Sequence, residues 1–331
     1  MKKILITGGT GSFGQAFARR LLALPPVVPG GITFVGDLHS FAPPISHSIE
    51  RIAIYARGEH QHETMARELT DERLRFFVGD VRDRDRLELA MRGIDTVIHA
   101  AALKVVPIAE YNPTECIATN VTGAENVIKA ALRTGVERVV ALSTDKAVNP
   151  INLYGASKLA AEKIFVAANS LSGGSCRFSV VRYGNVVGSR GSVIPLFKRL
   201  KEEGKPLPIT DVNMTRFWIT MDQAVDLVIR TLDTMRGREI IIPKIPSMKV
   251  VDLAEAIDPG GERVIVGIRP GEKIHETLIS EDEARVSAEF DGYYCVGDDF
   301  EKYTGPKKAY TSNNNDQWLS VEQLSAIIRR S

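Results

Sequence analysis

A tyrosine and a lysine near the middle of the chain have the spacing of a proton-transfer pair. Tyr154 and Lys158 are four residues apart, so on a helix they share one face. An ammonium group beside a phenol lowers the phenol's pKa from about 10 toward neutrality. We therefore predict that Tyr154 acts as a general base that takes a proton from a substrate hydroxyl, with Lys158 as its partner.

A second group of reactive side chains precedes this pair. The apolar run Arg138–Leu142 reads as a buried strand, and Ser143, Thr144, Asp145 and Lys146 follow it directly. Polar residues at the carboxyl end of a strand are typical of catalytic positions in sheets of parallel strands. The same acid and amine would also form an ordinary salt bridge at a strand end. We treat Thr144, Asp145 and Lys146 as catalytic candidates.

Glycines at the start of the chain have the pattern of a dinucleotide-binding turn. The strand-like run Lys3–Thr7 leads into Gly8, Gly11 and Gly14, and a helical pattern follows. Glycine permits the tight turn, the approach of the main chain to a pyrophosphate, and close packing of helix on strand. The helix N-terminus supplies N–H donors for the phosphates. Together with Tyr154, this motif predicts transfer of a hydride from a substrate carbon to a nicotinamide.

Two later strand ends extend the predicted cofactor site. Asp80 follows the third strand, where its carboxylate can accept a hydrogen bond from the adenine amino group. Small residues follow the fourth strand and leave room for main chain beside the ribose and pyrophosphate. The predicted cofactor-binding residues are Gly8, Thr10, Gly11, Ser12, Phe13, Gly14, Arg57, Asp80, Val81, Ala100, Ala101, Ala102, Lys104, Tyr154 and Lys158.

The end of the second strand decides between NAD and NADP. An acid there binds the ribose 2′-hydroxyl, whereas an arginine accommodates a 2′-phosphate. Spacing from the glycines nominates Ile32–Asp37, with Asp37 and NAD. The alternative is Arg51–Tyr55, with Arg57 and NADP. A helical segment leads from Arg57 into the third strand, as a βαβ unit requires, so we interpret residues 25–50 as an insertion and predict NADP.

The alternation of strands and helices predicts the fold. Short, continuously apolar runs alternate with amphipathic helices, as in sheets covered on both faces. This pattern predicts an α/β protein with a Rossmann-type doubly wound parallel sheet and a smaller C-terminal α/β substrate domain. The predicted strands are Lys3–Thr7, Arg51–Tyr55, Leu74–Val78, Thr96–His99, Arg138–Leu142 and Phe178–Arg182.

Glycine and proline become frequent after Asn185, which indicates a second domain. We assign residues 1–184 and about 217–242 to the cofactor domain, with the remainder, 185–216 and about 243–331, to the substrate domain. Trp218–Met235 reads as a helix that returns to the first domain. Ser320 and Gln323 form a capping box for a last helix through Arg330.

Composition excludes several classes of protein. A net charge of +1 lacks the basic footprint of a nucleic-acid binder. The N-terminal apolar run is too short for a signal sequence or a membrane span, so we expect a cytoplasmic protein without a membrane partner. The 3 cysteines are widely spaced and suggest buried thiols, without a disulfide framework or a metal site.

Longer motifs bring a family resemblance. The segments TGGTGSFG, GDVRD, HAAALK, STDKAVNPINLYGASK and RYGNVVGSRGSV resemble the extended short-chain dehydrogenases/reductases. More narrowly, the chain is similar to inverting UDP-N-acetylglucosamine 4,6-dehydratases that epimerise C5 and begin pseudaminic acid synthesis. The resemblance also covers PIAEYNP, MTRFWIT, PKIPSMK, IRPGEK and NNNDQWL, which is nearly everything except the insertion. It departs at Gly58, where an Asp is common, and at Gln61, where a Lys is usual.

The resemblance implies a lyase that recycles NADP internally within each turnover. The sugar is oxidised at C4, water is eliminated across C5 and C6, hydride returns to C6, and C5 is inverted. By resemblance, Lys146 is the base at C5, Asp145 the acid at O6, and Tyr154 the base at O4. Lys146 must then be neutral, which burial beside the cofactor cation and Lys158 would favour. Retaining dehydratases carry Asp-Glu instead of Asp145-Lys146, and 4-epimerases usually lack the pair.

The resemblance also implies residues for the UDP-sugar. Arg216 and Arg269 are expected to bind the diphosphate, Glu272 the ribose, and Thr210 with nearby main chain the uracil. The full predicted substrate set is Lys104, Asn185, Val193, Thr210, Met214, Arg216, Arg269 and Glu272. The alternative functions are a related UDP-sugar 4,6-dehydratase or epimerase, a 4-epimerase, or a non-catalytic NADP-binding regulator. Members of the family form oligomers, so we expect a homo-oligomer.

The assigned base gives a first prediction. Lys146→Ala should abolish dehydration of UDP-N-acetylglucosamine, because no other group takes the C5 proton, while NADP binding persists. Product formation followed by NMR and cofactor binding measured by titration check both halves. Undiminished product formation by the variant would refute the assignment.

Overall fold

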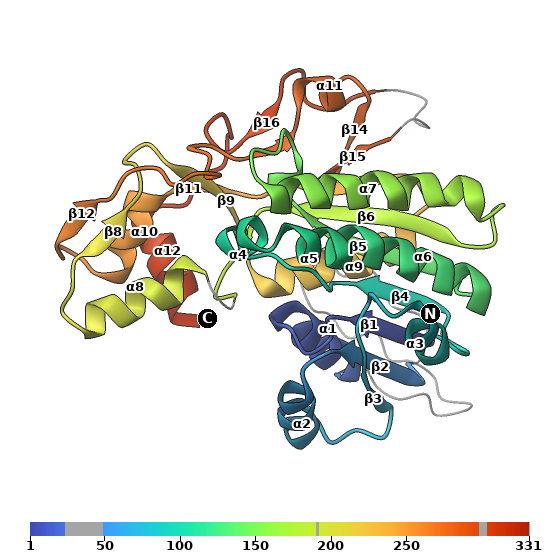
Figure 1. The fold of residues 1–331 in the computed structure, drawn as a ribbon. Helices are drawn as coiled ribbons and strands as arrows, with labels where there is room; N and C mark the ends of the chain where they lie inside the picture. The colour runs from blue at the N-terminus through green and yellow to red at the C-terminus, as the bar shows by residue number, and fades with distance from the viewer. Residues whose placement is uncertain (24–48, 190–191, 298–302, 331) are drawn as a thin grey trace, which may run out of the picture.

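The computed structural model describes residues 1–23, 49–189, 192–297 and 303–330. Its large sheet has the strand order β14-β15-β10-β6-β5-β4-β1-β2-β3 (Figure 1). All neighbours from β3 to β10 pair in parallel, and β15 and β14 add an antiparallel edge. These strands are β1 (Lys3–Thr7), β2 (Arg51–Ala56), β3 (Leu74–Val78), β4 (Thr96–His99), β5 (Arg138–Thr144), β6 (Arg177–Tyr183), β10 (Ile240–Pro243), β14 (Ser287–Phe290) and β15 (Tyr293–Val296).

Helices cover both faces of this sheet. One layer consists of α3, α6 and α7, which contact one another in sequence, and α1 packs with α9 in the other. The helices of this part are α1 (Ser12–Leu22), α2 (Glu59–Glu68), α3 (Arg84–Ala90), α4 (Val106–Tyr111), α5 (Pro113–Ile117), α6 (Gly123–Thr134), α7 (Leu153–Leu171), α9 (Met221–Thr234) and α11 (Glu281–Ala284). A π-helical turn, Ala118–Thr122, precedes α6. The predicted Rossmann-type fold is confirmed.

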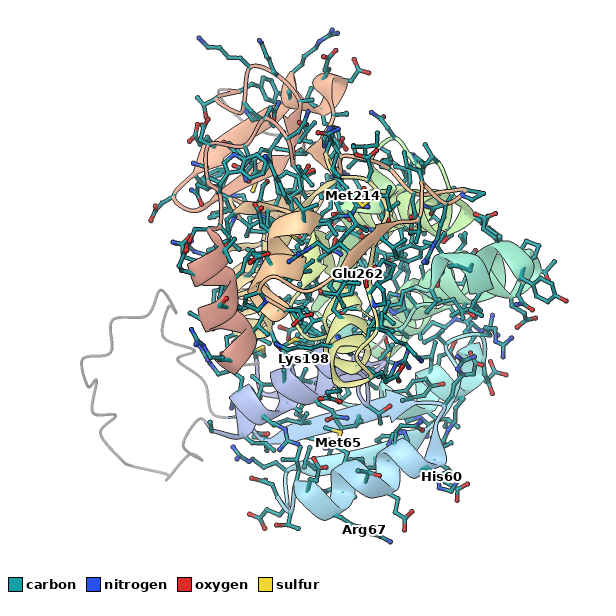
Figure 2. All side chains as sticks on the ribbon, turned by 90° about the vertical axis from the view of Figure 1, so that its left-hand side faces the viewer. His60, Met65, Arg67, Lys198, Met214 and Glu262 are labelled. Carbon is teal, nitrogen blue, oxygen red and sulfur yellow. The ribbon has the colours of Figure 1, made fainter. Side chains whose placement is uncertain are left out.

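The predicted second strand has the expected place. β2 pairs with β1 in parallel, with Lys3 opposite Arg51, and β3 follows on its other side. The helix predicted between β2 and β3 is α2, where Met65 faces the sheet and His60 and Arg67 project away from it (Figure 2). The predicted insertion lies outside the described residues except for Ile49 and Glu50, and Asp37 lies outside them too.

A smaller unit lies beside the carboxyl ends of the parallel strands, at the left of Figure 1, and carries Lys198, Met214 and Glu262 in Figure 2. It has a separate hydrophobic core that includes Phe197, Trp218 and Leu253. Its elements, together with the separate two-stranded sheet of β13 and β16, are β7 (Asn185–Val186), α8 (Val193–Glu202), β8 (Leu207–Ile209), β9 (Thr215–Ile219), β11 (Ser247–Lys249), α10 (Val250–Ile257), β12 (Arg263–Ile265), β13 (Thr277–Ile279), β16 (Tyr310–Thr311) and α12 (Val321–Arg330).

Three details refine the predicted layout. The helix expected at Trp218–Met235 is wrong at its start, because Trp218 ends up in β9 and a capping box between Thr220 and Gln223 begins α9 at Met221. The capping box of Ser320 and Gln323 is present before α12. Residues 287–296, within the range proposed for the substrate domain, extend the large sheet through β14 and β15.

A buried ion cluster joins β6 of the large sheet to the helices α7 and α11. Arg182 on β6 is fully buried and donates to Glu162 on α7 and to Glu283 on α11. Removing one partner would leave an uncompensated buried charge, so the three elements are held together. The 3 cysteines are buried thiols, as expected. Within the described residues, no helix is long and apolar enough to cross a membrane.

Candidate active site

The predicted cofactor residues surround one cavity of about 900 Å³ at the carboxyl ends of the strands. All of them line it, from the glycine turn after β1 to Tyr154 and Lys158 on α7. Tyr55, Gly58, Gln61, Thr119, Tyr183 and Met221 line it as well, and sequence reasoning did not assign them. Thr144 and Lys146 are also in the wall, whereas Asp145 is completely buried behind it.

The glycine turn has the geometry that a dinucleotide requires. Gly8 has a φ of +67°, and a Cβ on it would lie 2.8 Å from the backbone nitrogen of Ala101. A Cβ on Gly14 would lie 2.5 Å from Gly9, so only glycine lets the start of α1 pack this closely on the turn. The first turn of α1, at Ser12, lines the cavity, and the N-terminus of a helix suits a pyrophosphate. The residues present therefore fit a dinucleotide.

Arg57 lies at the rim of this cavity, directly after β2. Its side chain is 57% exposed, and its Nη1 is 3.8 Å from Oδ2 of Asp80. Asp80 also accepts hydrogen bonds from Arg82, which outweigh partial burial and lower the pKa of its carboxyl. The side chain of Gln61 folds over Gly58, where a Cβ would lie 1.8 Å from its Oε1. Of the two arginines beside this end of the cavity, Arg57 has the more exposed side chain and Arg82 the less exposed one.

Tyr154 and Lys158 occupy the first turns of α7 and are both buried. Nζ of Lys158 donates to the backbone oxygen of Leu142 at 2.6 Å, and burial lowers the pKa of this amine to about 8. Burial raises the pKa of Tyr154 to about 12, and the charge of Lys146 and a hydrogen bond with Thr144 oppose this rise. The expected lowering by Lys158 is therefore wrong for this arrangement, because desolvation dominates and the cation that lowers the pKa of Tyr154 is Lys146.

Lys146 lies between two carboxylates. Its Nζ is 3.0 Å from Oδ1 of Asp145 and 3.2 Å from Oε1 of Glu276, both of which are almost fully buried. Burial lowers the pKa of Lys146, but the two carboxylates outweigh it, so the pKa is raised. The expectation of a neutral Lys146 is thus wrong for this arrangement. Burial raises the pKa of Asp145, which suits an acid.

The predicted substrate residues, apart from Lys104, line a second cavity of about 560 Å³ in the smaller unit. Asn185 and Val186 line both cavities, so the two adjoin beside the catalytic residues. Nη1 of Arg216 donates to the backbone oxygen of Ile274 at 3.0 Å, which aims the guanidinium along this wall. The residues brought together here are Asn185, Val193, Thr210, Met214, Arg216, Arg269 and Glu272, while Lys104 lines the first cavity.

The loop 269–276 is fastened to the segment after β5 by contacts that sequence reasoning missed. Nδ2 of Asn152 donates to the backbone oxygen of Gly271 at 2.8 Å, and Nζ of Lys273 donates to that of Val148 at 2.6 Å. The ion pair of Glu276 with Lys146 is the third contact. Asn152 also caps α7 by accepting from the backbone nitrogen of Gly155. Only the cap has a sequence signal, an asparagine before a helical run.

Comparison with known proteins places the chain in a family. The family model described as "Polysaccharide biosynthesis protein" matches residues 41–298. The chain belongs to this family. It is 49% identical to the UDP-N-acetylglucosamine 4,6-dehydratase (inverting) of Campylobacter jejuni, over 99% of this chain and 97% of that protein. The resemblance expected from the motifs is confirmed.

The chain is also similar to a curated epimerase and to a solved structure. The UDP-glucose 4-epimerase of Rickettsia akari is 40% identical, over 99% of this chain and 95% of that protein. The X-ray structure of Pen from Bacillus thuringiensis superposes with a TM-score of 0.86 at 33% identity, covering 99% of this chain and 97% of that one. The fold is therefore shared with that structure along nearly the whole length of both chains.

Asn152 gives a prediction that separates its two hydrogen bonds. Asn152→Ala loses both the helix cap and the bond to Gly271, whereas Asn152→Asp keeps an acceptor for the cap and loses the donor. We expect the alanine variant alone to lose about 1 kcal/mol in the free energy of unfolding, measured with urea. In both variants, hydrogen exchange at the amide of Glu272, which donates to Arg269, should speed up. Unchanged exchange in both would mean that Asn152 does not hold the loop.

Proposed function

We propose that this protein is a UDP-N-acetylglucosamine 4,6-dehydratase of the inverting type. Its product is a UDP-4-keto-6-deoxy-L-sugar formed by oxidation at C4, loss of water across C5 and C6, hydride return to C6 and inversion at C5. The observation that carries the proposal is the position of Lys146 and Tyr154 in the wall of the first cavity, which the second cavity adjoins, with Asp145 paired to Lys146 behind that wall. The 49% identity with the Campylobacter jejuni enzyme of that name supports it over the full chain.

Each catalytic side chain has one task in this scheme. Tyr154 takes the O4 proton, and Lys158, one turn further along α7, is its proposed partner. Lys146 takes the C5 proton, which is acidic once C4 is a ketone. Asp145 gives a proton to O6, so that the hydroxyl leaves as water. Thr144 orients the pair, since its hydroxyl donates to Oδ1 of Asp145 at 2.9 Å.

The first cavity fits NADP in this proposal. When bound, the nicotinamide dinucleotide supplies the reversible hydride acceptor that the oxidation at C4 and the reduction at C6 need. The turn at Gly8, Gly11 and Gly14 would hold its pyrophosphate, and Arg57 its 2′-phosphate. Asp80 and Val81 would contact the adenine, with Ala100, Ala101 and Ala102 beside the ribose and pyrophosphate.

The second cavity fits the UDP moiety. Arg216 and Arg269 supply cations for the diphosphate, and Glu272 has a buried oxygen, Oε2, without a hydrogen-bond partner among the described residues. Such an atom is expected where a ligand hydroxyl donates, which suits the ribose. Thr210 and Met214 lie in the same wall, where uracil contacts are proposed. A homo-oligomer and a place in pseudaminic acid synthesis stay predictions from the resemblance.

A 4-epimerase is the second candidate, because the Rickettsia akari relative carries that name at 40% identity. Both reactions begin with oxidation at C4, but an epimerase needs no acid and base at C5 and C6. Incubation with UDP-N-acetylglucosamine and NMR of the product separates the two. A 4-keto-6-deoxy sugar with inverted C5 supports the proposal, and a C4 epimer or no reaction contradicts it.

The NADP assignment predicts a selective effect at Arg57. Arg57→Leu should raise the dissociation constant for NADP by roughly 10- to 100-fold, because one charge-assisted contact to the 2′-phosphate is lost. The dissociation constant for NAD should change little. Arg67→Leu is the matched control, since Arg67 projects from the far side of α2 (Figure 2). Equal losses for both dinucleotides, or none, would argue against the role of Arg57. Calorimetry measures the dissociation constants of both dinucleotides for the wild type and for the two variants.

A further inference from the structure

Glu276 is a buried acid whose carboxylate meets the catalytic pair from the other part of the chain. It directly precedes β13 and is 2% exposed. Its Oε1 is 3.2 Å from Nζ of Lys146 and 3.8 Å from Nε of Arg216, so one oxygen joins the catalytic amine to a cation of the second cavity. Its Oε2 is buried and has no hydrogen-bond partner among the described residues. Burying a carboxylate oxygen without a hydrogen-bond partner costs free energy, so its retention suggests a function.

The dehydration step needs a proton on Asp145 and none on Lys146. The transfer of one proton from Nζ of Lys146 to Oδ1 of Asp145, across 3.0 Å, creates both forms at once. An N–H bond breaks, an O–H bond forms, and the net charge of the pair is unchanged. The free oxygen of Asp145, Oδ2, is also buried without a partner among the described residues, as expected for a group that alternates between two protonation forms.

We propose that Glu276 is a positioning residue for dehydration, which holds the amine of Lys146 against Asp145 and sets the pH range in which the pair shares a single proton. The inference rests on the proposed dehydratase function. Glu276 also pairs with Arg216, which lines the second cavity. The same carboxylate therefore acts on the arginine proposed to bind the diphosphate and on the proton shared by Asp145 and Lys146.

The charges around the pair determine the sign of the effect. The titratable groups that face Asp145 and Lys146 in the described chain are Glu276, Arg216 and Lys273, together with the phenol of Tyr154. A negative neighbour favours the protonated form of both an amine and a carboxyl. Glu276 therefore raises the pKa of both members of the pair, and removing its charge lowers both.

Glu276→Gln tests this inference, because it keeps the shape of the side chain and removes the charge. The single-turnover rate of water loss from UDP-N-acetylglucosamine, measured against pH, should fall by about 10-fold or more at its maximum. Both limbs of its pH profile should move to lower pH by roughly 1 to 3 units. Glu276→Asp keeps the charge at a greater distance, so it should restore the position of the limbs at a reduced rate.

Two further variants complete the design. Glu239→Gln removes another buried glutamate, bonded to Ser179 and to the backbone of Arg236, and should leave rate and profile unchanged. Lys273→Met removes a positive charge that faces Glu276 and should move the limbs to higher pH. This opposite shift decides the matter if circular dichroism shows that Glu276→Gln does not fold.

The outcomes are distinguishable. A Glu276→Gln enzyme that is slower but keeps the wild-type pH profile would show a merely structural role and overturn the inference, as would unmoved limbs in Lys273→Met. A wild-type enzyme that forms no 4-keto-6-deoxy sugar in the same assay would contradict the proposed function itself.

Discussion

The ammonium of Lys146 lies between two buried carboxylates, and each comes from a different part of the chain. Asp145 follows the central strand β5, whereas Glu276 directly precedes β13. Separating buried partners of this kind costs several kcal/mol, because each would be left without compensation. The cluster therefore fixes the loop 269–276 against the catalytic segment. Asn152 and Lys273 hold the same two segments together by hydrogen bonds to backbone oxygens.

This constraint places the two cavities so that one substrate can span them. The parallel sheet presents its strand ends to the cofactor side, with the glycine turn, Lys158 and Tyr154 around a single cavity. The smaller unit packs its own core and presents Arg216, Arg269 and Glu272 to the other cavity. In the proposed mode of binding, Arg269 and Glu272 contact the nucleotide from the same loop that carries Glu276. Binding energy from the remote end of a substrate can in this way order the groups at the reacting carbon.

Much of this arrangement could be predicted from the sequence where local signals are strong. Apolar runs located β1 to β6 within a residue or two at each end, whereas the parallel strand β10 was not predicted. The continuity of the βαβ unit assigned the second strand to Arg51 rather than to the segment before it. The glycine spacing and the Tyr154–Lys158 pair located the first cavity at the carboxyl ends of the strands, because both motifs depend on geometry within a few residues. The start of α9 was misplaced because Trp218 and Ile219 can belong to a strand or to a helix. The cap at Thr220 determines that the helix begins only after them.

Other features depend on contacts between distant segments and left no local trace. Glu276 reads as any acid before a short strand, and only the fold brings it to Lys146. The antiparallel strands β14 and β15 join the large sheet although they follow the smaller unit in sequence. The pKa directions of Tyr154 and Lys146 were also misjudged. Desolvation and two carboxylates determine them, and neither is visible in spacing along a helix.

In the proposed reaction, a base and an acid act at C5 and C6 after oxidation at C4. The reaction of UDP-N-acetylglucosamine in D2O tests this directly, with the positions of deuterium in the product read by NMR. The proposed mechanism requires deuterium from solvent at C5 and a protium transferred from C4 at C6 of a 4-keto-6-deoxy sugar with inverted C5. A product that keeps its original hydrogen at C5, with the hydroxyl at C6 intact, would rule the mechanism out.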